Sequence, residues 1–292
     1  MFARLLYILC SVVVLVSCGG PTPAGNNKQK RPQIHKSIRK PKKGHKAQPI
    51  NKSQTLLAEQ FSFDSIEIPM TNHDCHSFMI RHTAYTVDYN DALCIPNWVA
   101  YVLTREHTDG PHKRLNSFSP DPAILDPVLH EDYTRNPGKY DRGHMAPAAD
   151  MKWSRTAMEE SFYTSNICPQ NNNLNRGDWN DIEELVRDYA NKYGSIYVVC
   201  GPIVEEPHDV IGRYHTIAVP SAFFKALLRC SNGHWYTIGF VCKNTSGNRP
   251  LLSYVVSIDE IERLTGHDLF WKLPDDVEEE IEKDVILDGW FL

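Results

Sequence analysis

Apolar runs separated by polar segments between residues 56 and 292 predict a domain rich in β-strands. Short runs of β-branched and aromatic residues, separated by turn-forming residues, are typical of strands in a sheet. Such runs occupy residues 78–87, 98–103, 195–200, 215–219, 222–230, 235–241 and 251–256, and a further strand begins at Tyr140. Asn232-Gly233 separates two of these runs, and this dipeptide favours the tight turn of a β-hairpin.

A helix with one apolar face is predicted from about Asp178 to Lys192, because Gly194 follows a run of helical periodicity. Its apolar positions are Trp179, Ile182, Leu185, Val186, Tyr189 and Tyr193. At ~100° per residue, Glu183 and Arg187 lie about 100° and 140° from the centre of this face. Either the two side chains line a cleft beside the buried face, or they form a solvent-exposed ion pair four residues apart.

The remaining elements complete an α+β pattern. Further helices are predicted at 154–162, 257–264 and 275–283. Ser154 is the expected N-cap of the first, and Ser257 with Glu260 has the spacing of a capping box. Residues 108–139 and 170–175 have the composition of irregular loops. We expect an α+β fold in which helices flank a central antiparallel or mixed β-sheet.

Residues 1–17 predict a signal for export. Arg4 precedes an apolar run from Leu5 to Val16, which is too short to span a bilayer comfortably. Leu15-Val16-Ser17-Cys18 resembles a bacterial lipobox, in which cleavage precedes a cysteine that is then lipidated. We expect Cys18 to anchor an exported protein in the cell envelope, in the periplasm or at the outer membrane and cell surface of a bacterium. A plain secretory signal is the alternative, and the membrane leaflet that holds the anchor stays open.

Charge divides the chain into two regions. Residues 1–58 contain eleven Lys and Arg and no Asp or Glu, so they carry +11 and the remainder carries −16 of the net −5. Residues 18–55 have little to bury and are predicted to form a basic, disordered tether before a folded domain at 56–292. Six cysteines remain in that domain, and their disulfide connectivity cannot be chosen from sequence: Cys75, Cys94, Cys168, Cys200, Cys230 and Cys242.

Candidate chemistry is concentrated between Tyr140 and Arg187. His144 can accept a proton near neutral pH, and Arg142 offers a planar guanidinium to phosphate oxygens. Asn175 supplies a hard amide oxygen of the kind that suits Mg²⁺. Each residue alone is more typical of a turn or a helix cap, but together they favour metal-assisted attack on a phosphodiester.

Several blocks of sequence occur in a specific order. They are Asn97-Trp98-Val99-Ala100-Tyr101, Asp141-Arg142-Gly143-His144-Met145-Ala146-Pro147, Ser165-Asn166-Ile167 with Pro169-Gln170, and Leu174-Asn175-Arg176-Gly177-Asp178-Trp179 followed by Glu183. In this order the chain resembles the DNA/RNA non-specific endonuclease family, sugar-non-specific nucleases that include mitochondrial endonuclease G. The resemblance extends over about residues 75–285. It implies a ββα-metal (His-Me finger) site, in which two strands with the Asp-Arg-Gly-His motif precede a metal-bearing helix.

The resemblance also implies roles for individual residues. His144 would be the general base that activates water, and Asn175 would be the direct ligand of a hydrated Mg²⁺ ion, with Mn²⁺ as an alternative. Glu183 would hold water in the hydration shell of that ion.

Three arginines would act on the phosphate. Arg142 and Arg187 would steady it and its transition state, and Arg114 matches the further family arginine that stabilises pentacoordinate phosphorus. The block around Arg114 aligns only loosely. Asp141 would be structural and would place Arg142 and His144.

The predicted function is a metal-dependent endonuclease that hydrolyses phosphodiester bonds of DNA and RNA without sequence specificity. Two alternatives use the same fold: a catalytically silent envelope protein that binds a partner, and a metal phosphodiesterase for a non-polymeric substrate. The net charge of −16 on residues 59–292 opposes nucleic-acid affinity, since non-specific binding usually relies on basic patches. Eight of its acids lie between Asp275 and Asp288, where they could form a face away from the cleft. The oligomeric state stays open.

Overall fold

The computed structural model describes residues 65–292 except 246 and 288. The predicted signal peptide, lipidated Cys18 and basic tether lie outside these residues. The chain divides into two units, 1–49 and 50–292, and the fold described below is that of the second. In this described part, no helix has both the length and the apolar content needed to cross a bilayer.

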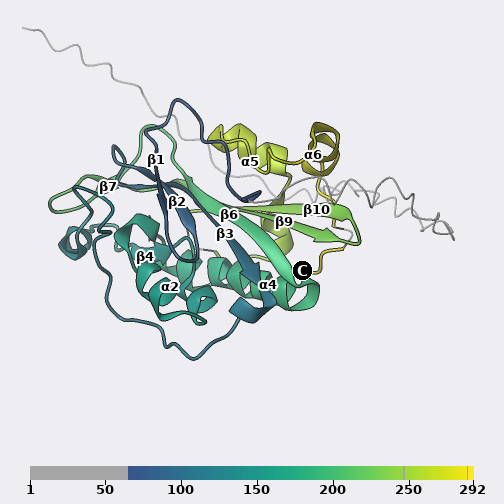
Figure 1. Ribbon diagram of the computed structural model, residues 1–292. Helices are drawn as coiled ribbons and strands as arrows, with labels where there is room; N and C mark the ends of the chain where they lie inside the picture. The colour runs from purple at the N-terminus through teal and green to yellow at the C-terminus, as the bar shows by residue number, and fades with distance from the viewer. Residues whose placement is uncertain (1–64, 246, 288) are drawn as a thin grey trace, which may run out of the picture. The chain divides into compact units, whose positions relative to one another are not determined.

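Seven antiparallel strands form the central sheet, in the order β1-β2-β3-β6-β9-β10-β11 (Figure 1). They are β1 (Phe78–Arg81), β2 (Thr86–Asn90), β3 (Ile95–Thr104), β6 (Ser195–Ile203), β9 (Ala222–Ser231), β10 (His234–Lys243) and β11 (Val255–Val256). The predicted α+β class is therefore confirmed, and the sheet is antiparallel rather than mixed.

Both faces of this sheet are covered by helices, and the central strands are therefore buried on both sides. Along β9, Phe223 and Leu227 enter one hydrophobic cluster while Phe224 and Leu228 enter the other, as the two-residue period of a strand requires. The first cluster contains the apolar face of α4 (Asp178–Tyr193). The second contains residues of α5 (Ile258–Thr265) and contacts α6 (Asp275–Glu282), which lie on the opposite side in Figure 1.

A smaller unit lies on the α4 side of the sheet. Strand β4 (Asp141–His144) pairs antiparallel with β5 (Ile167–Gln170), and α2 (Arg155–Glu160) lies between them in sequence. The chain then enters the short helix α3 (Asn172–Arg176) and continues directly into α4. This ββα arrangement is the one that the family resemblance implies.

The other short elements connect these parts. A separate two-stranded sheet pairs β7 (Val210–Ile211) with β8 (Ile217–Ala218). The 3₁₀ helices are η1 (Arg105–His107), η2 (His130–Thr134), η3 (Ala148–Met151), η4 (Thr164–Asn166) and η5 (Leu251–Tyr254).

Capping and turn residues correctly predicted where two helices and one hairpin begin or end. The hydroxyl of Ser154 accepts a hydrogen bond from the Ala157 amide at the start of α2, and Gly194 ends α4 with φ of 98°. Asn232 and Gly233 both have positive φ, 52° and 75°, as a tight hairpin turn between β9 and β10 requires.

Four predicted segments were wrong in detail. Residues 78–87 form two strands, because the His82 amide bonds the Tyr85 carbonyl and closes a turn between them. Residues 251–256 begin as η5 after Pro250 and keep only two strand residues. Residues 215–219 contribute to the separate β7–β8 pair, and 170–175 mostly form α3, whose N-cap is Asn171.

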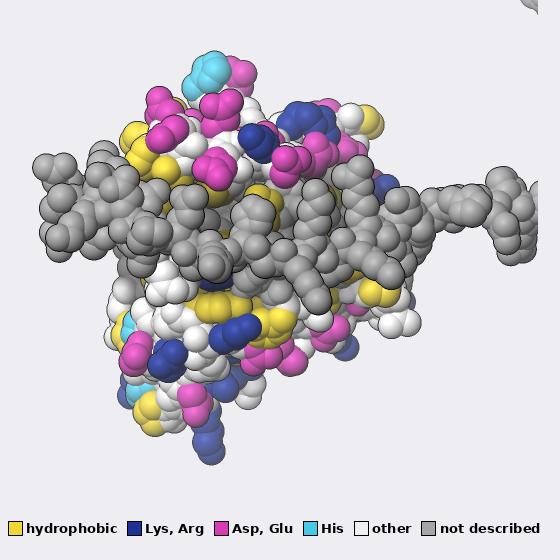
Figure 2. Space-filling model, turned by 90° about the vertical axis from the view of Figure 1, so that its right-hand side faces the viewer, with side chains coloured by type: hydrophobic (Ala, Val, Ile, Leu, Met, Phe, Trp, Pro, Cys, Tyr) yellow, Lys and Arg dark blue, Asp and Glu magenta, His cyan; other side chains and the backbone are white. Residues whose placement is uncertain are grey.

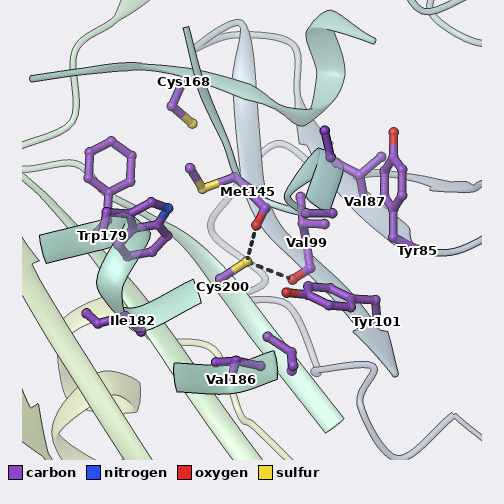
Figure 3. Close-up of a cluster of buried hydrophobic side chains, with 14 of the residues drawn as sticks. Tyr85, Val87, Val99, Tyr101, Met145, Cys168, Trp179, Ile182, Val186 and Cys200 are labelled. Atoms are coloured by element: carbon purple, nitrogen blue, oxygen red, sulfur yellow. Dashed lines mark hydrogen bonds between the residues drawn. The ribbon is translucent and has the colours of Figure 1, made fainter. Parts of the chain in front are cut away.

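The core beneath β4 ties the small unit to the central sheet. The thiol of Cys200 on β6 donates to the carbonyl of Met145 at 3.2 Å and to that of Val99 at 3.6 Å (Figure 3). Trp179 and Ile182 of α4 face the same cluster. All six cysteines of the described domain have free thiols.

Aromatic residues near the end of the chain pack against the last turn of α4. The rings of Tyr189 and Trp290 meet edge to face at 4.7 Å, and the Tyr189 hydroxyl donates to the Phe291 carbonyl at 2.5 Å. The guanidinium of Arg229 lies 4.0 Å from the ring centre of Tyr193. Residues from two separate segments therefore hold the end of this helix.

Candidate active site

A pocket of about 740 Å³ opens where β4, α3 and α4 meet the loop of residues 108–139. Its walls are formed by Arg114, Phe118, His130, Tyr133, Thr134, Asn136, Tyr140, Asp141, Arg142, His144, Pro147, Ala148, Asn175, Arg176, Asn180 and Glu183. Most of these side chains are polar, and they come from four separate segments of the chain. The loop that is irregular in sequence thus supplies one wall of a defined pocket.

His144 stands at the end of β4 with 6% of its surface exposed. Its ring packs edge to face on Phe162 at 4.9 Å and lies 5.2 Å from Phe118. The Nε2 atom is buried without a hydrogen-bond partner, so Nδ1 is the ring nitrogen that can reach the pocket. Burial, followed by the charges of Arg114 and Arg142, lowers the pKa of His144 to about 3. The imidazole is therefore neutral at physiological pH.

The backbone around His144 is fixed by contacts with β5 and its preceding turn. The side chain of Asn166 accepts from the Ala146 amide and donates to the Ala146 carbonyl, both at 2.9 Å. A Cβ added at Gly143 would lie 2.2 Å from Oε1 of Gln170, which is fully buried beside it. Only glycine therefore lets β4 pack this closely on Gln170.

Asp141 holds the amide of Asn175 in one orientation. The carboxylate accepts from Nδ2 of Asn175 at 3.1 Å, from Nδ2 of Asn172 at 2.5 Å, and from Arg176 at 2.8 and 2.9 Å. Because Nδ2 of Asn175 is engaged, its amide oxygen is left for a ligand in the pocket. Asp141 was predicted to place Arg142 and His144, and the hydrogen bonds of its carboxylate go instead to three residues of α3.

The donor set of the pocket fits a hydrated divalent cation. An oriented amide oxygen from Asn175 and the carboxylate of Glu183 are hard oxygen donors, and both line the same polar pocket. Few protein ligands suit Mg²⁺, which keeps most of its own waters. Asn175 and Glu183 are thus the residues that would hold such an ion.

Glu183 occupies a partly buried position on α4. Burial raises the pKa of Glu183 to about 7, against the opposing charge of Lys225 and with a contribution from Asp150 in the same direction as burial. Its carboxylate therefore carries a proton part of the time near neutral pH when nothing positive occupies the pocket.

Near Glu183 lies a buried group of charged side chains. The sequence did not predict that these side chains come together. Arg187 donates from Nη1 to Oδ1 of Asp150 at 2.9 Å, and Asp150 is inaccessible to solvent. Lys225 on β9 is fully buried, 4.6 Å from the ring centre of Trp179, and its Nζ has no hydrogen-bond partner. Lys225 lies 42 residues beyond Glu183 in sequence, so no local pattern could have shown the relationship.

Two arginines bring positive charge to the pocket. Arg142 stacks over Phe118 at 4.3 Å and shares a 2.6 Å hydrogen bond with Nδ1 of His130. The exposed Arg114 lies 5.2 Å from the ring centre of Phe162. These ring contacts orient the guanidinium groups through their faces, and the hydrogen bond to His130 fixes Arg142 further. Phe118, Phe162 and His130 carry no sequence signal of their own, so only the fold reveals them.

The structure brings five of the six predicted site residues into one pocket. His144, Arg142, Arg114, Glu183 and Asn175 all line it. Arg187 is absent from the walls of the pocket and faces Asp150 instead. Its side chain therefore acts on the pocket through the charge it places near Glu183.

Comparison with known proteins identifies the family. The family model for DNA/RNA non-specific endonucleases matches residues 65–276. The chain belongs to this family. The matched range includes β4, β5, α3 and α4, and thus every residue placed in the pocket.

Relatives of this endonuclease family member include mitochondrial and bacterial nucleases. "Nuclease EXOG, mitochondrial" from Mus musculus is 32% identical over 246 residues, which cover 77% of this chain and 63% of that protein. "Nuclease" from Serratia marcescens is 32% identical over 240 residues, or 76% of this chain and 88% of the relative. The chain thus spans less than two thirds of the mouse relative and most of the bacterial one.

The fold of this family member agrees with a solved structure. A chain described under "Crystal structure of the EndoG/EndoGI complex: Mechanism of EndoG inhibition" matches with a TM-score of 0.63 and 27% sequence identity. The match covers 70% of this chain and 90% of that one.

Proposed function

We propose that this protein is a metal-dependent endonuclease that hydrolyses phosphodiester bonds of DNA and RNA without sequence specificity. The observation that carries the proposal is the meeting of His144, Asn175, Glu183 and two arginines in one polar pocket. Family membership supports it, because the related proteins are named as nucleases.

His144 is the proposed general base. Accepting a proton from water at Nδ1 requires the tautomer in which Nε2 carries the hydrogen. With a pKa of about 3 the free imidazole is a weak base. Arg114 and Arg142 contribute to that low value, so a bound phosphate that offsets their charge raises the basicity of His144 when substrate arrives.

Arg114 and Arg142 are the proposed phosphate-binding residues. Each packs on a ring that also contacts His144, Phe162 for Arg114 and Phe118 for Arg142. From there the guanidinium groups can contact the phosphate oxygens and stabilise the charge that grows in the transition state. Arg187, paired with Asp150, is proposed to position Glu183 electrostatically and not to contact the phosphate.

Asn175 and Glu183 are the proposed residues for Mg²⁺, with Mn²⁺ as the alternative ion. Such an ion supplies positive charge to the phosphate and the leaving oxygen. The orientation of Asn175 by Asp141 prepares the amide oxygen for this role, and Glu183 adds the negative charge that attracts the ion.

The negative net charge of residues 59–292 is compatible with a nucleic-acid substrate, because positive and negative side chains are distributed unevenly over the domain. Arg114, Arg142 and Arg176 line the pocket beside only two carboxylates, and one of these, Asp141, is paired with Arg176. The surface near α5 and α6 carries many of the acids (Figure 2). Phosphate therefore meets a locally positive pocket, although the body as a whole is negative.

The decisive experiment incubates the purified protein with supercoiled plasmid and with RNA, with and without EDTA. We expect cleavage of both polymers, loss of cleavage in EDTA, and recovery on adding Mg²⁺ or Mn²⁺. His144→Ala should lower kcat at least about a hundredfold, the size expected for a lost general base. Lys152→Ala, outside the pocket, is the matched control for handling and folding. Undiminished cleavage by His144→Ala would overturn the mechanism.

The two alternative functions have separate outcomes in the same experiment. A protein that binds DNA but cleaves neither polymer would be a catalytically silent binding protein. Hydrolysis of bis(p-nitrophenyl) phosphate without cleavage of either polymer would indicate a phosphodiesterase for small substrates.

Export and lipid anchoring at Cys18 complete the proposal. The motif Leu15-Val16-Ser17-Cys18 supports it. Expression of the full chain in a bacterium with labelled palmitate should label the parent and leave Cys18→Ser unlabelled. Labelling of Cys18→Ser to the same extent would contradict the anchor.

A further inference from the structure

A second group of acidic side chains lies on the face of the sheet opposite the pocket. Asp259 and Glu262 of α5 and Glu282 of α6 each place a carboxylate oxygen within 4.8 Å of the others. Figure 1 shows the two helices as neighbours above the sheet, while the ββα unit lies below it. The group is therefore separate from the pocket that contains His144.

Glu282 is the unusual member of this group. It is only 3% exposed, and its Oε1 atom is buried without a hydrogen-bond partner. A buried carboxylate without a partner costs free energy, because it has lost its hydration and gained nothing in exchange. Its position beside two further carboxylates increases that cost.

The surroundings of Glu282 add negative charge. Burial, followed by Glu262, Glu278, Asp259 and Asp268, raises the pKa of Glu282 to about 10. The basic residue of α5 does not offset this charge, because Arg263 is engaged by Glu260 at 2.7 and 2.8 Å. The group thus concentrates carboxylates at a place where a cation would relieve both repulsion and desolvation.

The helices that carry these side chains are held in place by other contacts. Oε1 of Glu262 accepts from the Leu269 amide at 2.6 Å, which orients the carboxylate and leaves its second oxygen for another partner. The Thr237 hydroxyl of β10 donates to the Ile281 carbonyl in α6. The three carboxylates are therefore presented by a fixed framework.

We propose that Asp259, Glu262 and Glu282 bind a divalent cation, and that Ca²⁺ is the ion that fits. Ca²⁺ takes six to eight oxygen ligands in a flexible geometry and accepts several carboxylates, whereas Mg²⁺ keeps most of its waters and usually binds only one or two. Three carboxylate oxygens that lie within 4.8 Å of one another therefore suit Ca²⁺ better. The exposed Asp259 leaves one side open to water, which completes the coordination of Ca²⁺.

The bound ion would join α5 to α6. Helix α5 packs on β9 and β10 and α6 packs on β10, and residues 266–274 connect the two helices in sequence. A cation held by both helices stabilises the folded chain only, because the unfolded chain does not bring the three carboxylates together. The site is therefore structural and independent of the proposed nuclease chemistry.

The test measures thermal unfolding of the full chain after EDTA treatment and desalting. At a Ca²⁺ concentration about a hundredfold above its dissociation constant, we expect Tm to rise by about 5–11 °C. Asp259→Asn keeps an exposed side chain of the same shape and should remove at least half of the rise. Glu282→Gln should remove nearly all of it. Glu280→Gln, an exposed position on the same helix, is the matched control and should keep the full rise.

Two further measurements distinguish Ca²⁺ binding at this site from metal binding in the pocket and from protonation of the carboxylates. Asn175→Ala should keep the Ca²⁺-dependent rise, because its side chain belongs to the pocket. A rise lost in Asn175→Ala but retained in Asp259→Asn and Glu282→Gln would overturn the proposal. So would a parent whose Tm is unchanged by Ca²⁺ and increases only as the pH falls, since a shared proton would then hold the carboxylates together.

Discussion

The Nδ2 atom of Asn175 donates a hydrogen bond of 3.1 Å to Oδ2 of Asp141. Asp141 belongs to β4 and Asn175 to α3, so this contact connects the strand that carries His144 with the helix that carries the proposed metal ligand. It also prevents the amide of Asn175 from turning its nitrogen toward the pocket. The relative orientation of base and metal ligand thus depends on one carboxylate.

Replacing Asp141 should therefore weaken metal binding more than it alters the chemical step. We expect Asp141→Ala to raise the Mg²⁺ concentration for half-maximal cleavage about 10–100-fold, the range seen when groups that orient metal ligands are lost. Activity at saturating Mg²⁺ should fall much less. Metal titration of cleavage measures both quantities, with Asp181→Asn on α4 as control. An unchanged Mg²⁺ requirement would show that Asp141 does not orient Asn175.

The pKa of Glu183 predicts how metal binding depends on pH. Since this pKa is raised to about 7, protons compete with the cation below that pH, and the apparent Mg²⁺ affinity should fall up to about tenfold per pH unit. Glu183→Gln cannot be protonated, and its weaker affinity should vary much less between about pH 6 and pH 8, one unit on each side of the pKa. A parent with no such slope would contradict the role given to Glu183.

The same raised pKa has a consequence for stability without metal. A carboxyl group whose folded pKa exceeds its unfolded pKa stabilises the fold fully at low pH and loses that contribution as pH rises through the folded value, here about 7. The metal-free parent should therefore lose about 1–3 kcal/mol from this group between pH 5 and pH 8 relative to Glu183→Gln. Urea unfolding of both proteins in EDTA at the two pH values measures the difference.

The buried charge of Lys225 should hold the pKa of Glu183 below the value that burial alone would give. Its charge opposes the effect of burial on the pKa of Glu183, so Lys225→Met should move the pH dependence of Mg²⁺ affinity about one unit toward alkaline pH. The variant should remain folded, because methionine fills a similar volume and removes an unpaired buried nitrogen. Lys243→Met, at an exposed position, should leave the profile in place.

Gly143 and Gln170 should behave as a coupled pair. Gly143→Ala places a methyl group 2.2 Å from Oε1 of Gln170 and should destabilise the protein by about 1–3 kcal/mol. The double variant with Gln170→Ala should be more stable than the sum of the single effects, by at least about 0.5 kcal/mol. Chemical denaturation of the four proteins tests this, and strict additivity would show that the close contact is not what requires glycine.

Sequence alone predicted the elements that local chemistry determines. The apolar spacing of α4 gave its position to within a residue, and with it the place of Glu183 beside the buried face. The resemblance supplied the ββα arrangement of β4 and β5 with the following helices, which periodicity could not provide. Asn232-Gly233 predicted its hairpin because both residues tolerate positive φ.

What sequence missed depends on contacts between distant segments. The strand signal at 78–87 spans a turn, because strand propensity does not register a chain reversal closed by His82 and Tyr85. Arg187 was expected in the pocket, yet a buried partner at Asp150, far away in sequence, draws it inward. In the sequence, Lys225 is one polar residue in an apolar strand. Only the packing of β9 against α4 shows that its charge acts on Glu183.

The helix that carries Glu183 ends against residues from the last few positions of the sequence. Tyr189 packs on Trp290 and bonds the carbonyl of Phe291, so these terminal residues belong to the framework of the pocket although they lie far from it along the chain. For protein engineering, this makes Leu292 a poor place for a fusion or affinity tag. A tag there would disturb the contacts that Trp290 and Phe291 make with Tyr189 in α4.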